Sequence, residues 1–453
     1  MKNEERGNFG SRLGIILATA GSAVGLGNVW RFPYMTGQNG GAAFILIYVG
    51  CILLLGIPGM LSEFIVGRRS QSNAARAYHQ LSGGRPWRLV GYLGILTSMI
   101  ILGFYAVVAG WCLQYLYASI AGQTLGSPAY VQLYFQDFAT SAFKPVVCGI
   151  TFVLLTHMVV VRGIQRGIER ASKWLMPLLF VLLLVLVVAS LLLPGAMHGV
   201  AFLFYPDFSK LSHSVFLEAL GQAFFSLSLG TACLCTYASY FTRQTNLLRS
   251  ASQIALLDTL VAILSGLIIF PAAASVGINA DSGPSLIFIT LPSVFQQAFA
   301  ALPSVGCAVS ILFYALLVFA ALSSTISMHE IGTAFFIEEF HLSRRRAALV
   351  VTLVASVLCT FCALSVGAWP QLRIAGLSLM DFCDQLTANL MLPLGGLLTC
   401  LFVGWYIPQS VVTAELTNHG HHGRWLCRPF LFAIRYVCPI CILLVFLHQL
   451  GVI

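Results

Sequence analysis

Several long apolar segments of the sequence are interrupted by polar side chains of the kinds that bind a small cation. Asp258 lies well inside one apolar run, and an ionisable group at such a depth is functional by default because burying it unpaired is costly. Its natural partner is a cation. Magnesium and calcium need several carboxylates or waters, whereas a monovalent ion is satisfied by carbonyls, hydroxyls and one charge. The pattern favours a monovalent ion.

A second feature is a break in the apolar segment that begins near Leu13. Three glycines, Gly21, Gly25 and Gly27, fall within seven residues and are followed by Asn28. Each glycine lowers helix propensity by about 1 kcal/mol. Unwound backbone at membrane depth is tolerated only where it is buried in protein or lines a wet cavity. The sequence therefore predicts an unwound, functional stretch here.

A matching break follows five segments later, where Ser226, Ser228, Gly230 and Thr231 crowd the centre of an apolar run. Paired breaks in two halves of a chain indicate a transporter's binding site, because freed carbonyls bind a cation and a half-helix amino terminus holds a carboxylate. Close helix packing is the alternative for the small residues alone. Three adjacent hydroxyls at 323–325 add to the pattern, although one of them is expected to bond back to its own helix.

The elements that position these residues are membrane-spanning helices. Of 453 residues, 58% are hydrophobic and 9% are charged, far below the quarter or so of a soluble chain. The mean hydropathy is +0.89. Runs of roughly 20 apolar residues, enough to cross a bilayer, number about eleven, so we expect an all-α polytopic membrane protein. They begin near Leu13, Ala43, Val90, Val146, Trp174, Phe216, Ile254, Val305, Ala347, Met380 and Phe430.

Basic residues collect in alternate loops and so predict the orientation, since cytoplasmic loops carry the excess of lysine and arginine. They are found before the first span, after the second, and between spans four and five, six and seven, and eight and nine. The amino terminus is therefore expected in the cytoplasm and the carboxyl end outside. The net charge of +9 reflects this topology and gives no continuous nucleic-acid surface. The thirteen cysteines sit mostly in apolar spans and predict neither disulfides nor a metal site.

The stretch from Arg12 to Tyr34, followed by 39–41, closely resembles the first helix of the neurotransmitter:sodium symporter family. The segments 56–68 and 221–240 look like its second and sixth helices, and the match covers essentially the whole chain. The resemblance implies a single domain of the LeuT-type fold, a five-plus-five inverted repeat in which helices 1 and 6 are broken. Repeat one would span about 12–194, repeat two about 214–408, and an extra helix about 430–450. Short outer loops and the absence of Asn-x-Ser/Thr sequons suggest a bacterial member in the inner membrane.

The resemblance implies two co-transported sodium ions beside the substrate. The ligands of the first would be Ala23, Asn28, Ser226 and Asp258, completed by the substrate carboxylate. The ligands of the second would be Gly21, Val24, Ala320, Ser323 and Ser324. Because Asp258 already supplies a negative charge where animal members add chloride, we expect transport to be independent of chloride.

The resemblance also implies a pocket for a small L-amino acid. Its carboxylate would meet Leu26, Gly27 and Tyr105, and its amino group the carbonyls near Ala23, Phe225 and Ser228. The side chain and its surroundings would involve Ile101, Val108, Phe225, Thr231, Ser324 and Met328. Relatives commonly carry a large apolar residue flanked by glycine where this chain has Thr231 and Ala232, which predicts a roomier pocket for hydrophobic or aromatic amino acids. Arg31 with Asp381, and Arg6 with Glu338, would form the outer and inner gates.

Three other functions use the same composition differently. An ion channel would need a ring-forming filter sequence, and a membrane enzyme would need a nucleophile–base pair or a metal cluster at the midplane; the sequence shows neither. A membrane sensor that binds an amino acid without transporting it fits the sequence as well, and so does a symporter for another amine or an osmolyte. The oligomeric state is open.

Overall fold

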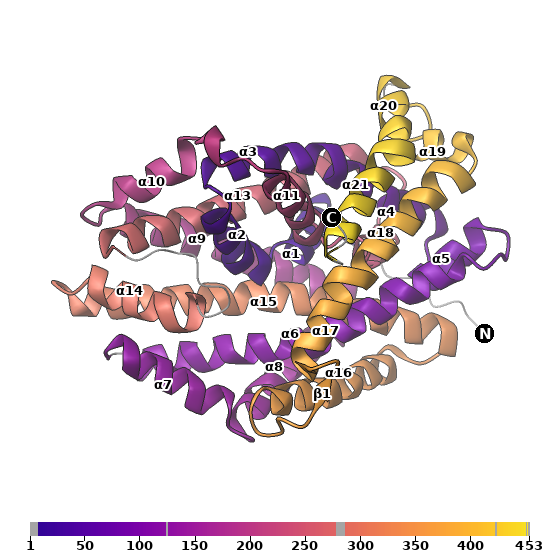
Figure 1. Cartoon of the computed structure of the whole chain (residues 1–453). Helices are drawn as coiled ribbons and strands as arrows, with labels where there is room; N and C mark the ends of the chain where they lie inside the picture. The colour runs from indigo at the N-terminus through magenta and orange to yellow at the C-terminus, as the bar shows by residue number, and fades with distance from the viewer. Residues whose placement is uncertain (1–7, 124–125, 278–285, 422–423, 450, 452–453) are drawn as a thin grey trace.

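The computed structural model of the chain describes residues 8–123, 126–277, 286–421, 424–449 and 451. Helices make up nearly all of this part of the chain (Figure 1). In the same residues the single sheet is a two-stranded antiparallel hairpin, in which β1 (Arg373–Ile374) pairs with β2 (Leu377–Ser378). The all-α class predicted from the sequence is confirmed.

The first half of the chain supplies the following helices, in order: α1 (Arg12–Ala23), η1 (Gly27–Arg31), α2 (Phe32–Gln38), α3 (Ala42–Cys51), η2 (Ile52–Gly56), α4 (Ile57–Ser70), α5 (Ala74–Leu81), α6 (Arg88–Ile120), α7 (Pro128–Ala139), α8 (Lys144–Val160), η3 (Ile164–Glu169), α9 (Arg170–Leu191), α10 (Ala196–Phe204) and η4 (Phe208–Lys210).

The second half supplies α11 (His213–Ser226), α12 (Cys233–Ala238), α13 (Leu247–Ser275), η5 (Leu286–Thr290), α14 (Leu291–Ala298), α15 (Pro303–Phe340), α16 (Arg344–Val366), α17 (Leu379–Gln385), η6 (Leu386–Met391), α18 (Leu392–Leu401), η7 (Phe402–Tyr406), α19 (Gln409–Leu416), η8 (Arg424–Leu426), α20 (Cys427–Phe432), η9 (Ala433–Val437) and α21 (Cys438–Gln449). Most segments labelled η are π-helical turns that continue a neighbouring α-helix.

Each of the eleven span starts expected from hydropathy falls inside one of these helices. In the described residues, eight helices are long and apolar enough to cross a membrane, and two bent pairs raise the number to ten. The expected sixth span consists of two short helices, α11 and α12, which are not among the eight. One bent pair, α7 with α8 at 72°, was not foreseen. The membrane class is thus confirmed, whereas the count of eleven stays a prediction.

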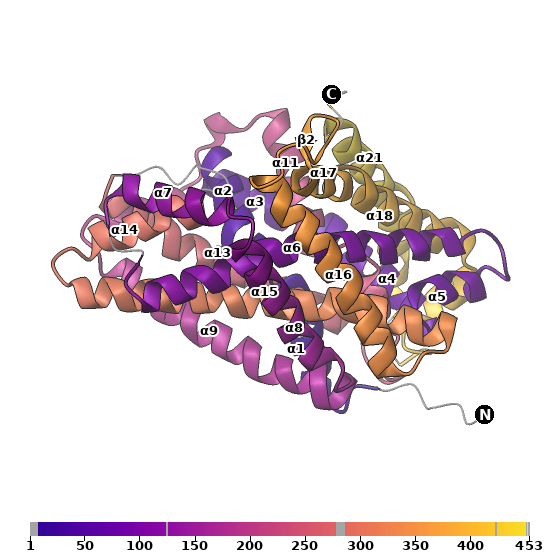
Figure 2. The ribbon, with the colours of Figure 1, turned by 90° about the horizontal axis from the view of Figure 1, so that it is seen from below.

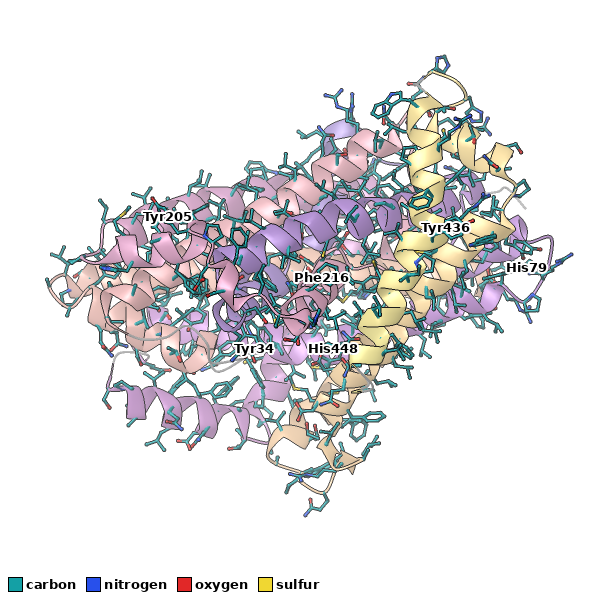
Figure 3. All side chains as sticks on the ribbon, turned by 45° about the horizontal axis from the view of Figure 1, so that its top comes forward. Tyr34, His79, Tyr205, Phe216, Tyr436 and His448 are labelled. Atoms are coloured by element: carbon teal, nitrogen blue, oxygen red, sulfur yellow. The ribbon has the colours of Figure 1, made fainter. Side chains whose placement is uncertain are left out.

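The long helices α6 and α15, of 33 and 38 residues, run through the middle of the bundle in both views (Figures 1 and 2). They pack against each other, and α8 and α16 pack on α6. At one end of the bundle lie α5 and α19, and at the opposite end lie α7, α10 and α14 (Figure 1). The last helical run, which carries Tyr436 and His448, lies along the flank and brings His448 within 3.7 Å of Glu218 on α11 (Figure 3).

The outer flank of the bundle is apolar. In the second half of α9, four aliphatic side chains that point away from the core are each exposed by about half; they are Val181, Leu184, Val185 and Val188. Apolar surface of this extent is rare on soluble monomers and marks a surface that contacts something apolar. In a protein with these membrane spans, the apolar flank faces lipid.

Two interruptions of the helices lie inside this frame. The first separates α1 from η1 at residues 24–26, and the pair bends by 54°. The second separates α11 from α12 at residues 227–232, where Ser228, Gly230 and Ala232 all have positive φ. Positive φ is costly for any residue with a Cβ, so a helix cannot run through this stretch. Both breaks predicted from the sequence are present.

Candidate sodium and amino-acid sites

The first break is held open by hydroxyls from α15. Ser323 Oγ and Ser324 Oγ each donate to the carbonyl of Val24, both at 3.2 Å, and Ser323 Oγ also lies 2.9 Å from the carbonyl of Ala320. A Cβ added to Gly21 would come within 3.3 Å of the Ser323 side chain, so these elements touch. All five residues expected to hold the second sodium ion are therefore gathered in one place, with carbonyl and hydroxyl oxygens that suit an ion of single charge.

A second cluster surrounds the carboxylate of Asp258, which is fully buried on α13. Asn28 Nδ2 donates to Asp258 Oδ1 at 2.7 Å, and Ser226 Oγ donates to Asp258 Oδ2 at 2.8 Å. Asn28 Nδ2 also lies 3.2 Å from Ser226 Oγ. Ser226 and Asp258 lie 198 and 230 positions after Asn28 in the sequence. Residues of three helices thus converge on one buried carboxylate. These are the side chains expected to hold the first sodium ion.

Two further residues of this cluster were not predicted. Tyr48 on α3 donates its hydroxyl to Asp258 Oδ2 at 3.3 Å and is completely buried. Gln222, one helical turn before Ser226, is also buried, and both polar atoms of its side chain lack a hydrogen-bond partner among the described residues. Buried polar atoms are nearly always satisfied, so the unpaired amide of Gln222 is an exception. The sequence signal that could have identified Tyr48 and Gln222 is that each is a polar residue within an apolar segment.

Backbone amides of the first break face Tyr105 on α6. The amide of Leu26 donates to the Tyr105 hydroxyl at 3.1 Å. A Cβ at Gly25 would lie 2.5 Å from Ser324 Oγ and 3.1 Å from the Tyr105 hydroxyl, so only glycine leaves this approach open. A Cβ at Gly27 would meet the ring of Phe225 at 3.2 Å. Leu26, Gly27, Tyr105, Phe225 and Ser324, all expected to bind substrate, are thus neighbours, and Ala23 is the last residue of α1.

The other expected pocket residues are placed less tightly. Ile101 and Val108 are buried on the same helix as Tyr105, at spacings of four and three that put them on one face. Met328, which is partly buried, lies on α15, and α15 packs against α6. Their contact with substrate stays a prediction.

Hydroxyls of the second break bond to backbone. Ser228 Oγ donates to the carbonyl of Ser22 at 3.4 Å, which ties the two breaks together. Thr231 Oγ1 donates to the carbonyl of Ser228 at 2.7 Å and accepts from the amide of Cys233 at 3.2 Å. The hydroxyl of Thr231, a residue expected in the pocket, therefore hydrogen-bonds to backbone groups where α12 begins.

A second buried carboxylate supports this break. Glu63 on α4 is 3% exposed; its Oε1 accepts from the amide of Gly230 at 2.7 Å and its Oε2 from the amide of Cys235 at 3.3 Å. Amides at the end of a helix have no partner within the helix, and a buried carboxylate supplies one. The sequence showed Glu63 only as part of a family motif. Its position inside an apolar span was the same signal that identified Asp258.

The two residues of the expected outer gate each contact another group, and their pairing stays a prediction. The Arg31 guanidinium lies 4.2 Å above the ring of Phe225. Asp381 accepts from Ser378 Oγ at 2.7 Å and lies in the first turn of α17, and in the described residues no ion pair joins it to Arg31. The carboxylates whose charges act on Arg31 are those of Asp384 and, second to it, Glu218. Asp384 was not predicted, although it lies one turn beyond Asp381.

At the opposite end, Arg6 of the expected inner gate lies outside the described residues, so its pairing with Glu338 stays a prediction. Glu338 accepts from the amide and the side-chain nitrogen of Asn73, at 2.8 and 3.0 Å. A different carboxylate, Glu330, accepts from the Tyr240 hydroxyl at 2.8 Å and from Arg344 Nη1 at 3.2 Å. This buried network was not predicted from the sequence.

A comparison with known families identifies the fold built around these sites. The model of the sodium:neurotransmitter symporter family matches residues 6–127 and 140–453. The chain belongs to this family. Its members are sodium-dependent transporters that span the membrane, so the sequence resemblance and the LeuT-type fold are confirmed.

Individual relatives agree across the length of the chain. It is 38% identical to a protein of Bacillus subtilis described as the uncharacterized sodium-dependent transporter YhdH, over 100% of both chains. It is 28% identical to the sodium-dependent serotonin transporter of Drosophila melanogaster, over 84% of this chain and 66% of that protein. Among solved structures it is similar to the crystal structure of MhsT in complex with L-phenylalanine, with a TM-score of 0.88, 42% identity and coverage of 98% and 100% of the two chains.

Proposed function

We propose that this symporter couples the entry of two sodium ions to the uptake of a hydrophobic, in particular an aromatic, L-amino acid, and that it needs no chloride. The observation that carries the proposal is the convergence of Asn28, Ser226 and Asp258 next to the first break. Asn28 lies two residues beyond the Leu26 amide that faces Tyr105. A substrate carboxylate at that amide would be close enough to ligate an ion held by Asp258. Neither solute would then bind well without the other.

The second ion is supported by the oxygens at Val24, Ala320 and the two serines of α15. These oxygens carry no formal charge, so an ion of single charge is their natural occupant. Each sodium that moves down a potential of 100 mV contributes about 2.3 kcal/mol. Two ions with a zwitterionic substrate make uptake electrogenic.

The substrate class rests on the apolar residues around Tyr105 and on the L-phenylalanine complex of the similar protein MhsT. Ile101 and Val108 share the face of α6 that carries Tyr105, and the ring of Phe225 lies against Gly27. These side chains offer an apolar wall and no charged group. An aromatic or large aliphatic side chain fits that wall, whereas a charged one would lose its hydration without compensation.

Independence from chloride follows from the charge of Asp258. Its two oxygens already accept hydrogen bonds from Tyr48, Asn28 and Ser226. Those donors would suit an anion, and the carboxylate is the anion supplied by the chain. A chloride there would face a like charge in a medium of low dielectric, which is unfavourable.

We further propose that the end of the bundle with α5 and α19 faces the cytoplasm of a bacterial cell. Arg68, Arg69, Arg76 and Arg85 lie at this end, in accord with the excess of positive charge in cytoplasmic loops. The carboxyl terminus, after α21, would then lie outside. We also propose that the single domain consists of two repeats, at about 12–194 and 214–408, and an extra helix at about 430–450. Its activity is transport, with no enzymatic step.

Uptake into vesicles tests the proposal. Purified protein in liposomes is given each of the twenty amino acids, with sodium or choline outside and chloride or gluconate as the anion. We expect accumulation of phenylalanine, tyrosine, tryptophan, leucine or isoleucine that needs sodium, is electrogenic and is unchanged in gluconate. Thermal stabilisation by an amino acid without accumulation would make the protein a sensor, and stabilisation by none of the twenty would contradict the substrate class.

A further inference from the structure

Two hollows adjoin where α4, α13 and α19 meet, apart from the sites at the breaks. The first is small, about 40 Å³, and polar; it is lined by Arg68, Arg69, Gln71, Arg243, Glu415 and His419. The second is an apolar groove of about 560 Å³ between the η2–α4 helix and the α20–η9 helix. No residue of either hollow belongs to the substrate or sodium sites described above.

Arg68 stands between the hollows and joins their walls. Its Nη1 donates to the carbonyl of Thr245, and its Nη2 donates to the carbonyl of Glu415 at 2.6 Å. The residues that follow these two, Asn246 and Leu416, line the apolar groove. The polar hollow and the groove are therefore consecutive parts of one surface.

The polar hollow has an excess of positive charge. Arg68 is 2% exposed and its charge is met by Glu415, whose Oε2 lies 2.7 Å from Arg68 Nε. Arg69 is 46% exposed and lies 3.8 Å from the same carboxylate, and Arg243 is exposed. Three arginines against one glutamate leave a net charge of +2. Arg69 and Arg243 are available to an anion.

The groove has the dimensions and composition for a hydrocarbon chain. From Leu61 to Leu53 it follows eight residues of helix, about 12 Å at the usual rise. One leaflet of a bilayer core is about 15 Å thick. Trp425 lies at its rim with 75% of its surface exposed, as is typical of tryptophan at the level of lipid headgroups.

We propose that this surface binds one anionic phospholipid, with the phosphate on Arg69 and Arg243 and an acyl chain in the groove. Basic pockets between transmembrane helices on the cytoplasmic side are known to take such headgroups. A free anion would leave the groove empty, and a neutral lipid would leave the two arginines without a counter-charge. The charge and the groove together select an acidic lipid.

Lipid binding to the full-length protein tests this proposal without any transport assay. The purified chain in a neutral detergent is titrated with phosphatidylglycerol or phosphatidylcholine of identical acyl chains, and bound lipid is counted by native mass spectrometry. We expect phosphatidylglycerol to bind at least tenfold more tightly. In the double variant Arg69→Gln and Arg243→Gln, we expect its affinity to fall roughly thirtyfold, because each arginine near an anionic lipid surface contributes about fivefold.

Matched controls separate the site from general electrostatics. The double variant Arg345→Gln and Arg346→Gln removes the same charge from exposed positions at the start of α16 and should leave phosphatidylglycerol affinity unchanged. Ala433→Trp should fill the groove and weaken binding, whereas Leu349→Trp, at an exposed position on α16, should not.

Three outcomes would overturn the proposal. Equal affinity for the two lipids would exclude an acidic headgroup site. Equal losses in the two arginine pairs would reduce the effect to overall charge. Inorganic phosphate that competes with phosphatidylglycerol at equal concentration would show a pocket for free anions alone. Failure of amino-acid uptake would leave all three readings unaffected, so the lipid site and the transport function are tested separately.

Discussion

The two breaks differ in length and in what satisfies their backbone. The first, at 24–26, is short, and side chains of other helices reach it: Ser323 and Ser324 bond to the Val24 carbonyl, and Tyr105 accepts from the Leu26 amide. The second, at 227–232, is twice as long and has three residues with positive φ. The carboxylate of Glu63 accepts from its Gly230 amide and from the Cys235 amide in the first turn of α12.

The difference indicates a division of labour. At the first break, carbonyl and hydroxyl oxygens lie together. A cation site without a carboxylate is built from oxygens of these kinds. At the second break the carboxylate of Glu63 accepts a hydrogen bond from a backbone amide, and the Thr231 hydroxyl donates to the carbonyl of Ser228. We infer that the first break binds and releases ligands, while the second mainly preserves an unwound shape. Four substitutions test this inference.

The largest effect is expected at the first break. The double variant Ser323→Ala and Ser324→Ala removes the two hydroxyls proposed as ligands of the second sodium ion, each worth about 1.5–3 kcal/mol to a charged partner. We expect sodium affinity, measured from the sodium dependence of uptake, to fall by at least a hundredfold. Ser310→Ala on the same helix removes a hydroxyl that bonds to Ser119 and serves as the control. Unchanged sodium dependence in the double variant would place the second ion elsewhere.

A somewhat smaller effect is expected at the cluster around Asp258 on α13, to which Asn28 beside the first break belongs. Asp258→Ser removes the fixed charge but leaves the donors Tyr48 and Asn28. We expect uptake to become dependent on chloride, with a loss of roughly tenfold in gluconate, about 1.4 kcal/mol. Uptake by the parent protein should be equal in both anions. Equal uptake by the variant in the two anions would show that Asp258 does not take the place of chloride.

At the second break the effect should fall on stability. Glu63→Gln keeps one acceptor but replaces the other with a donor that faces the amide of Gly230 or Cys235. Leaving one buried amide unsatisfied costs about 1–3 kcal/mol. We expect a lower thermal midpoint of the purified protein, with substrate selectivity unchanged. Glu339→Gln, a partly exposed carboxylate on α15, should shift the midpoint by much less.

The smallest effect is expected for Thr231→Val, which keeps the shape of the side chain and removes its hydroxyl. The bond to the Ser228 carbonyl is lost, at a cost of about 1 kcal/mol. The ratio of uptake rates for phenylalanine and leucine should stay within twofold of the parent. A larger change in that ratio would mean that the hydroxyl contacts substrate, and the second break would then share the binding role of the first.

Patterns local in sequence predicted a large part of this architecture. Glycines at 21, 25 and 27 and the polar cluster at 226–231 predicted both breaks, because a helix in a membrane cannot lose its internal bonds without a compensating site. Asp258 was predicted to pair with a cation from its position inside an apolar run, and the family resemblance implied its place in the first sodium site. The two breaks are present, and Asp258 has hydrogen-bond donors around it, because a polar group inside the bilayer is costly without a partner; its role as a ligand stays a prediction.

The tertiary structure alone decided which distant residues became partners. Tyr48 meets Asp258 across 210 residues, and Arg68 meets Glu415 across 347. Glu330 accepts from Tyr240, and it is the charge of Asp384, rather than of Asp381, that acts on Arg31. Asp381 and Asp384 lie one helical turn apart and carry the same carboxylate group. Hydropathy fixes how deep each residue lies, but the rotation and packing of helices determine which side of a turn faces which neighbour.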